Sequence, residues 1–179
     1  MAKKTIEQLQ VVRQSDIQPE ILQNFFTGYI YENANKDPYK YTDELEQLYP
    51  DFKKWFITKV KPGLCGKIPE RELILLIAPD SGSIAGFAIL KKTGKESKIC
   101  TFRISEGWRN GGAGQKLMKA CLKYLDTDKP LITVSEKCKG SFEKIFKQFN
   151  FVQTQEICDL YVTGSKEYVY NGYLDSHNE

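Results

Sequence analysis

The chain has 179 residues, of which 41% are hydrophobic and 27% charged, a composition typical of soluble globular domains rather than disordered or fibrous ones. Lys and Arg exceed Asp and Glu by only 26 − 23 = 3 residues. This excess is too small to indicate a nucleic-acid-binding protein, so nucleic acid is not the expected partner.

The N-terminal third is predicted to be mostly helical. Residues 9–13 resemble a short strand, and apolar residues then recur at helical spacing from residue 17 to about residue 33. A second helical stretch covers about residues 43–60, with Pro50 starting a new segment or causing a kink. The sequence Lys61-Pro62-Gly63 is expected to end it.

The middle of the chain is predicted to form three strands at residues 72–78, 84–91 and 98–105, joined by short turns that contain glycine. Such strands form an antiparallel meander. The third strand is expected to alternate strictly. One side would carry Ile99, Thr101, Arg103 and Ser105, and the other Cys100, Phe102 and Ile104.

The last third alternates between helix and strand patterns. Helices are predicted at residues 114–125 and 140–149, and strands at residues 130–134, 151–162 and 167–170. The element order β-α-α-β-β-β-α-β-α-β-β indicates an α/β fold with a mixed sheet and helices packed on its faces. The length predicts one domain over residues 1–179, with a core at about 83–151 and a polar tail at about 171–179.

The cysteines and the apolar runs predict a cytoplasmic protein. The five cysteines are scattered without a C-x-x-C pair, which favours reduced thiols. The longest aliphatic run is six residues, far below the ~20 of a membrane-spanning helix, and no secretory signal is expected. With a single histidine, His177, no metal site is expected.

A glycine-rich loop carries the chemistry. Three glycines, Gly111, Gly112 and Gly114, fall within four residues between a predicted strand and a predicted helix. Glycines let the backbone approach a bulky ligand, and the first turn of a helix offers unpaired N–H groups and partial positive charge. The loop therefore predicts a phosphate or pyrophosphate site. It fits neither the Walker A nor the dinucleotide-binding pattern, and a turn without a ligand is the alternative.

Arg109-x-x-Gly112-x-Gly114 matches the [QR]-x-x-G-x-[GA] signature and thereby resembles the GNAT superfamily of acetyl-CoA-dependent N-acetyltransferases. The resemblance implies a GNAT-like acyltransferase fold with acetyl-CoA as cosubstrate. Loop amides would hold the CoA pyrophosphate, and the preceding strand would pair with the pantetheine arm, one of its N–H groups polarising the thioester carbonyl. The implied cofactor-binding residues are Phe102, Arg103, Ile104, Arg109, Asn110, Gly111, Gly112, Ala113, Gly114 and Gln115. Lys116, Lys119 and Lys123 could approach the phosphates, or form a solvated face.

The sequence departs from the family in its acid and base. Many members place a proton-donating Tyr in the last helix, where Phe146 stands in this chain. Some carry a basic Glu at the strand position that Lys98 occupies. Glu136 and Ser135, at the end of the strand that splays from the cofactor strand, are therefore candidate catalytic residues, with Glu136 as base. The alternative is a solvated Glu136 and catalysis by positioning, with water carrying the proton.

The predicted reaction is transfer of acetyl from acetyl-CoA to a primary amine: a small molecule, a protein amine or the amine of an aminoacyl-tRNA. An acidic, aromatic stretch at residues 37–51 would favour a cationic acceptor, or is a solvated helix start. Alternatives are a non-catalytic acyl-CoA-binding or regulatory module and a protein-interaction domain. The oligomeric state stays open, with a homodimer as one option.

Overall fold

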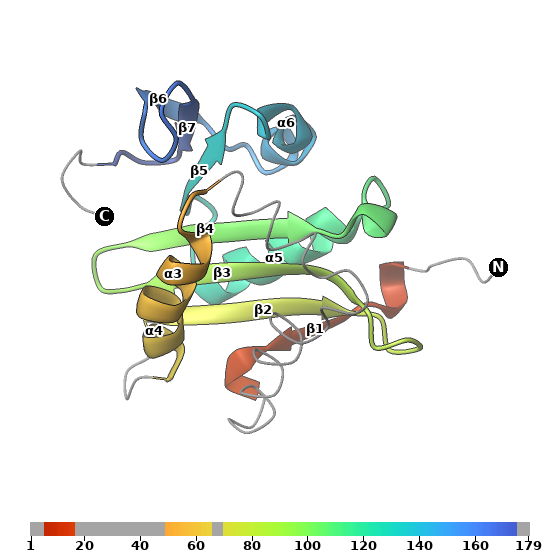
Figure 1. The fold of residues 1–179 in the computed structure, drawn as a ribbon. Helices are drawn as coiled ribbons and strands as arrows, with labels where there is room; N and C mark the ends of the chain where they lie inside the picture. Colours follow the sequence, from red (N-terminus) through yellow and green to blue (C-terminus); the bar gives the residue numbers. More distant parts are fainter. Residues whose placement is uncertain (1–5, 17–48, 66–69, 175–179) are drawn as a thin grey trace.

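The computed structural model describes residues 6–16, 49–65 and 70–174 (Figure 1). Seven strands form one sheet in the order β1-β2-β3-β4-β5-β7-β6, and all neighbours are antiparallel except the parallel pair β4–β5. The strands are β1 (Gln10–Arg13), β2 (Arg71–Ile77), β3 (Ile84–Lys92), β4 (Ser97–Ile104), β5 (Leu131–Ser135), β6 (Gln153–Cys158) and β7 (Lys166–Tyr170). The predicted α/β class with a mixed sheet is confirmed.

The helices lie on both faces of the sheet. They are α3 (Phe52–Trp55), the π-helix η5 (Phe56–Val60), α4 (Lys61–Cys65), α5 (Ala113–Leu125) and α6 (Lys139–Gln148). Short 3-10 turns are η1 (Ile6–Gln8), η2 (Gln14–Asp16) and η6 (Glu106–Trp108). The predicted helix at residues 17–33 and the start of the second helical stretch lie outside the described residues. Among the described helices, none is long and apolar enough to cross a bilayer.

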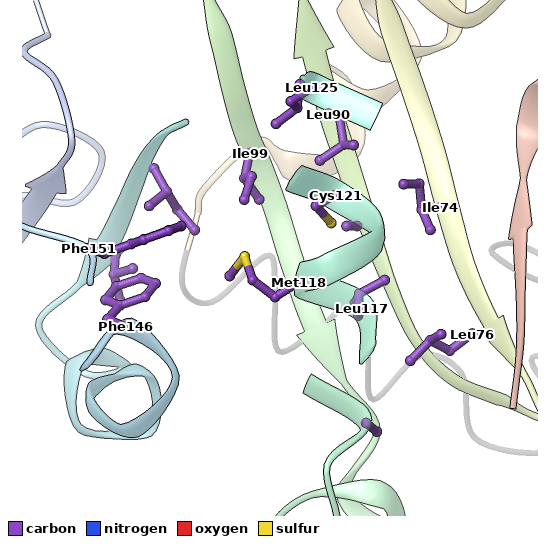
Figure 2. Packing of buried hydrophobic residues seen from close by; sticks show 14 of the residues in the cluster. Ile74, Leu76, Leu90, Ile99, Leu117, Met118, Cys121, Leu125, Phe146 and Phe151 are labelled. Atoms are coloured by element: carbon purple, nitrogen blue, oxygen red, sulfur yellow. The ribbon is translucent and has the colours of Figure 1, made fainter. Parts of the chain in front are cut away.

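Helix α5 covers one face of β2, β3 and β4 (Figure 1). Its apolar stripe, Leu117, Met118, Cys121 and Leu125, is buried against the sheet (Figure 2). The same cluster continues to Phe146 of α6 and to Phe151. Each such side chain contributes about 1.5–3 kcal/mol when it leaves water, so this cluster joins α5, α6 and the sheet into one core.

A second cluster covers the opposite face of the sheet. Phe56, Val60 and Leu64 pack on Leu73, Leu75 and Ile89 of β2 and β3. The prediction that Lys61-Pro62-Gly63 ends the helix is wrong, because these residues form the start of α4. Residues 52–65 form one unbroken helical run, so Pro62 lies inside it, directly after the π-helical turn η5. Prolines and π-helical turns are both typical of such local irregularities in a helix. Gly63 suits the close approach of β2, since a Cβ there would lie 3.1 Å from the Arg71 side chain.

The predicted strict alternation along β4 is wrong because Cys100 forms a bulge. Ile99 pairs with Leu90 and Thr101 with Ile89, so Cys100 is the extra residue in β4. A bulge reverses the side-chain alternation beyond it. Ile99 consequently shares the α5 face with Phe102 and Ile104, while Cys100 packs with the second cluster.

Strands β4 and β5 pair over a short distance and then diverge. Their register consists of Lys98 with Leu131 and Ile99 with Ile132. Beyond these pairs β4 continues to Ile104 and β5 to Ser135, and Figure 1 shows β5 turning away from β4 toward β7 and α6. The sheet therefore opens into a wedge at the carboxyl ends of the two strands, as the family resemblance implied.

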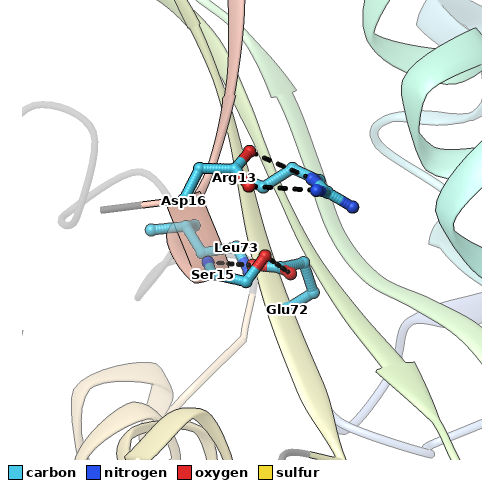
Figure 3. Close-up of polar contacts among 5 residues, drawn as sticks. All are labelled: Arg13, Ser15, Asp16, Glu72 and Leu73. Carbon is cyan, nitrogen blue, oxygen red and sulfur yellow. Dashed lines mark hydrogen bonds and ion pairs between the residues drawn. The ribbon is translucent and has the colours of Figure 1, made fainter. Parts of the chain in front are cut away.

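Polar contacts anchor the N-terminal strand to the sheet (Figure 3). The buried carboxylate of Glu72 accepts hydrogen bonds from the Ser15 hydroxyl at 2.9 Å and from the Ser15 N–H at 3.3 Å. Arg13 forms an exposed ion pair with Asp16 at 3.0 Å, which lowers the pKa of the Asp16 carboxyl. These contacts fix η2 beside β2.

Candidate active site

The glycine loop folds as a tight turn between η6 and α5. Asn110 and Gly112 both have positive φ angles, 60° and 101°. A left-handed backbone favours glycine, and Asn is among the side chains that tolerate it best. The Arg109 side chain fixes the start of the turn, because its Nε donates to the Ile104 carbonyl at 3.1 Å. The first-turn amides of α5 therefore follow the loop directly, where they lack intrahelical acceptors.

A cavity of about 720 Å³ lies in the wedge between β4 and β5. Such a volume is typical of small-molecule sites. It extends across the sheet, because its lining comes from both clusters: Phe102 and Ile145 belong to the α5 side, and Tyr49 and Cys100 to the opposite side. The loop residues Asn110, Gly112, Gly114 and Gln115 also line it.

Most of the predicted cofactor residues meet at this cavity. Phe102, Arg103, Ile104, Arg109, Asn110, Gly112, Gly114 and Gln115 line it. The other two lie beside it: Ala113 is buried under the loop, and Gly111 faces Ile6, whose Cδ1 would be 3.4 Å from a Cβ at that position. The assignment of these residues to acetyl-CoA stays a prediction, and the geometry is consistent with it.

The two candidate catalytic residues lie at the end of β5, beside the cavity rather than among its lining residues. Ser135 is buried, whereas Glu136 is exposed and donates its backbone N–H to the Lys166 carbonyl at 2.9 Å. The adjacent Lys137 and Cys138 do line the cavity. A catalytic role for Glu136 or Ser135 stays a prediction.

Tyr49 also lines the cavity. The sequence indicates only that this residue belongs to the acidic, aromatic stretch at residues 37–51. Its ring packs edge-on against Tyr161 at 5.4 Å between centroids. Burial raises the pKa of the Tyr49 phenol, the nearby Glu167 and Cys138 raise this pKa further, and the neighbouring Ser135 acts in the opposite direction. Asp51 is exposed, while Asp37, Asp43, Glu44 and Glu46 lie outside the described residues.

The three lysines of α5 do not line the cavity. The Lys116 ammonium donates to the Ile6 and Glu7 carbonyls at 3.2 and 3.1 Å, so it holds the N-terminal turn η1 against the loop. Lys119 and Lys123 are exposed, as in the solvated alternative. The cavity is lined instead by Lys137 and Lys144, which the sequence reasoning missed because helix α6 is placed beside the loop only by tertiary packing.

Phe146, at the position that aligns with the family's tyrosine, faces the core. Its ring stacks on Phe151 at 5.1 Å and meets Tyr170 at 4.4 Å between centroids. It is 3% exposed, and the residues of α6 that line the cavity are Ser141, Phe142, Lys144, Ile145 and Gln148. Sequence alignment alone therefore does not place a side chain of this helix at the reacting atoms.

Replacing Phe146 with Tyr is expected to lower the free energy of unfolding by about 1–3 kcal/mol without raising activity, because the new hydroxyl would enter an apolar core. Urea denaturation of Phe146→Tyr and wild type measures this loss. Phe142→Tyr is the matched control, since it adds the same hydroxyl beside the cavity and should lose less stability. A rise in kcat for Phe146→Tyr would contradict the placement.

The chain is similar in sequence to a known acetyltransferase family and in fold to solved acetyltransferases. Residues 41–160, more than half of the chain, match the family model of an acetyltransferase (GNAT) domain. The ribosomal-protein-S18-alanine N-acetyltransferase from Escherichia coli superposes with a TM-score of 0.57 at 12% identity, covering 96% of this chain and 99% of that one. A Bacillus subtilis acetyltransferase in complex with CoA gives 0.53 at 12% identity, with coverages of 93% and 99%.

A GNAT-family acetyltransferase from Bacillus cereus gives a TM-score of 0.53 at 15% identity, covering 90% of this chain and 94% of that one. Comparison with curated protein sequences gives no match. At these identities the structural likenesses show the fold alone, and the family follows from the sequence match over residues 41–160. The glycine loop, the wedge and this match lead to one conclusion: the chain belongs to the GNAT family of acetyltransferases.

Proposed function

We propose that this protein transfers the acetyl group of acetyl-CoA to a primary amine by direct attack of the amine in a ternary complex. Membership of the family implies acyl transfer from an acyl-CoA. The proposal adds that the acyl group is acetyl and that the acceptor is a primary amine. The observation that supports this proposal is the cavity, which joins the glycine loop to the opposite face of the sheet. One substrate can therefore enter from each face.

The loop and β4 supply the cosubstrate site. Amides of the segment from Asn110 to Gln115 would bind the pyrophosphate, where the start of α5 adds partial positive charge. The backbone of Phe102 to Ile104 lies along the cavity, on the edge of β4 that has left β5. An extended pantetheine arm fits this edge, and a β4 N–H directed at the thioester oxygen would stabilise the charge of the tetrahedral intermediate.

The amine must lose its proton before it attacks. A free lysine-like amine with a pKa near 10.4 is neutral only about 0.04% of the time at pH 7. The rate is therefore expected to rise with pH until the acceptor itself is neutral. Placing the amine against the thioester supplies the remaining acceleration.

Glu136→Gln tests the candidate base. If Glu136 accepts the amine proton, kcat/KM falls by about 10²–10⁴ and the acidic limb of the pH profile changes. Glu143→Gln, on the first turns of α6, is a control for loss of one carboxylate. An unchanged kcat/KM and pH profile would remove Glu136 from the mechanism and favour proton transfer through water or another residue.

Two measurements test the proposed function. Calorimetry with acetyl-CoA separates acyl-CoA binding from a protein-interaction role. CoA release is then followed against a panel of an aliphatic diamine, a lysine peptide, a peptide N-terminus and an aminoacyl-tRNA. Chromatography should detect the CoA, because the exposed Cys158 would itself react with a thiol reagent. Binding without amine-dependent CoA release would instead support the non-catalytic acyl-CoA-binding module.

A further inference from the structure

We propose that Tyr49 donates the proton to the departing CoA thiolate, with the Ser135 hydroxyl beside it at the end of β5. This inference rests on the proposed acetyl transfer. It concerns the general acid, which many family members place as a Tyr in the last helix. Phe146 occupies that position and lies in the core, so the usual position supplies no proton donor in this chain.

Several side chains along the described part of the cavity carry an acidic proton. Those with an O–H or S–H group are Tyr49, Cys100, Cys138, Thr101, Thr133 and Ser141, and Lys137 and Lys144 carry ammonium groups. A phenol has an ordinary pKa near 10 and is both donor and acceptor, whereas the aliphatic hydroxyls are much weaker acids. Tyr49 is the phenol of this set, and the thiols of Cys100 and Cys138 are its main competitors.

The cavity places Tyr49 at the acyl end of a bound cosubstrate. The glycine loop opens on the α5 face of the sheet, where Ile104 and Ile145 belong to the first core cluster. Tyr49 packs with the second cluster on the opposite face. A CoA that is held at the loop and extends along β4 through the wedge therefore brings its thioester toward Tyr49.

The end of β5 brings Ser135 to the same side. Val134 belongs to the α5-side cluster, and side chains alternate along a strand, so Ser135 points to the opposite face. Ser135 pairs in register with Glu167 of β7, and both residues are buried. Both lie close enough to act on the Tyr49 phenol: the proximity of Ser135 lowers its pKa, while Glu167 raises it. The buried Ser135 Oγ has no hydrogen-bond partner of its own among the described residues.

This environment keeps Tyr49 protonated while the thioester is intact. Burial is the largest cause of its raised pKa, followed by Glu167 and Cys138. A protonated phenol can donate a hydrogen bond to the sulfur as negative charge develops there. The same increase in pKa makes the phenol a weaker acid than one that titrates near the working pH, so its placement at the sulfur is what the proposal requires. The edge-on contact with Tyr161 limits the orientations that the Tyr49 ring can take.

The proton balance closes without another reactant. The neutral amine attacks the carbonyl carbon, the C–N bond forms, and the C–S bond then breaks with its electron pair on sulfur. The sulfur takes the Tyr49 proton. The attacking nitrogen gives up its extra proton, which returns to the tyrosinate through the Ser135 hydroxyl or a water molecule. The products are the acetamide and CoA thiol.

Tyr49→Phe is the decisive variant because it keeps the ring and removes the hydroxyl. We expect kcat to fall about 100-fold or more, while the Kd for acetyl-CoA and the melting temperature stay within about twofold and a few degrees of wild type. Tyr173→Phe, which removes an exposed phenol, is the matched control and should retain full activity. Wild-type kcat in Tyr49→Phe would overturn the proposal, as would a loss confined to KM.

Three further variants separate the donor from its competitors and from a packing effect. Ser135→Ala should lower kcat about fivefold to tenfold with an unchanged Kd for acetyl-CoA, because it loosens the phenol and leaves the rings in place. Cys138→Ser and Cys100→Ser should each retain kcat within about threefold. A 100-fold loss in either variant beside an active Tyr49→Phe would assign the proton to that thiol instead.

Failure of the proposed function itself gives a different result. In that case wild type would not bind acetyl-CoA, or no amine would release CoA from it, whatever residue stands at position 49. Active wild type with equally active Tyr49→Phe would reject the role of Tyr49 alone.

Discussion

Replacing Gly112 with Ala is expected to weaken acetyl-CoA binding at least tenfold. Gly112 has a φ angle of 101°, where an L side chain is strained by about 1–3 kcal/mol. The loop must either carry this strain or relax and move its amides away from the pyrophosphate. Since 1.4 kcal/mol is a factor of ten in affinity, calorimetry with acetyl-CoA measures the effect directly.

Gly114→Ala is the matched control for this loop. A Cβ at Gly114 would lie 3.4 Å from Ile145 Cδ1 and 3.7 Å from Ile104 Cγ1, which are ordinary packing distances. The position lies inside α5, and the family signature allows Ala there. Gly114→Ala should therefore fold normally and bind acetyl-CoA more tightly than Gly112→Ala. Wild-type affinity in Gly112→Ala would show that the pyrophosphate binds elsewhere.

Gly86→Ala is expected to destabilise the fold and the site together. A Cβ at Gly86 would lie 2.7 Å from both the Arg103 carbonyl oxygen and Ile104 Cδ1. Because one of these atoms is backbone, β3 and β4 must shift relative to each other. Overpacking of this kind costs about 1–3 kcal/mol, occasionally more, and the shift falls on the segment of β4 that lines the cavity.

Urea denaturation and acetyl-CoA calorimetry on Gly86→Ala test both effects. Gly94→Ala is the control, because a Cβ there would meet no heavy atom within 4 Å. Both variants lose the same backbone freedom in the unfolded chain, so their difference isolates the steric contact. Equal stability of the two variants would mean that the strands absorb the methyl group without shifting.

The sequence predicted the elements with strong periodicity and missed features that depend on one extra residue. The predicted helix at residues 114–125 matches α5 closely, because its apolar residues repeat along one face. The bulge at Cys100 has no such signal, since the residues on either side of it look like an uninterrupted strand. Pro62 similarly suggested a helix end, although the helical run continues through it after the π-helical turn η5.

The candidate site also has one part that the sequence predicted and one part that it did not. The turn at the glycine loop was predictable because its signature is local: the residues that shape the turn are neighbours in sequence. Tyr49 had no comparable signal, since it reaches the cavity only through packing of distant segments against β5 and the β6–β7 turn. Phe146 shows the converse problem, because a motif position transferred by spacing pointed to a residue whose side chain faces the core.

The short pairing of β4 with β5 has a practical consequence for handling the protein. Two residue pairs join the β1–β4 half of the sheet to the β5–β7–β6 half, so a cosubstrate in the wedge supplies contacts that the empty sheet lacks. A ligand at 100 times its Kd stabilises the folded state by about 2.7 kcal/mol. Purification and crystallisation in the presence of CoA should therefore give the better-behaved sample, and a simple melting curve can rank acyl-CoA analogues before any acceptor is known.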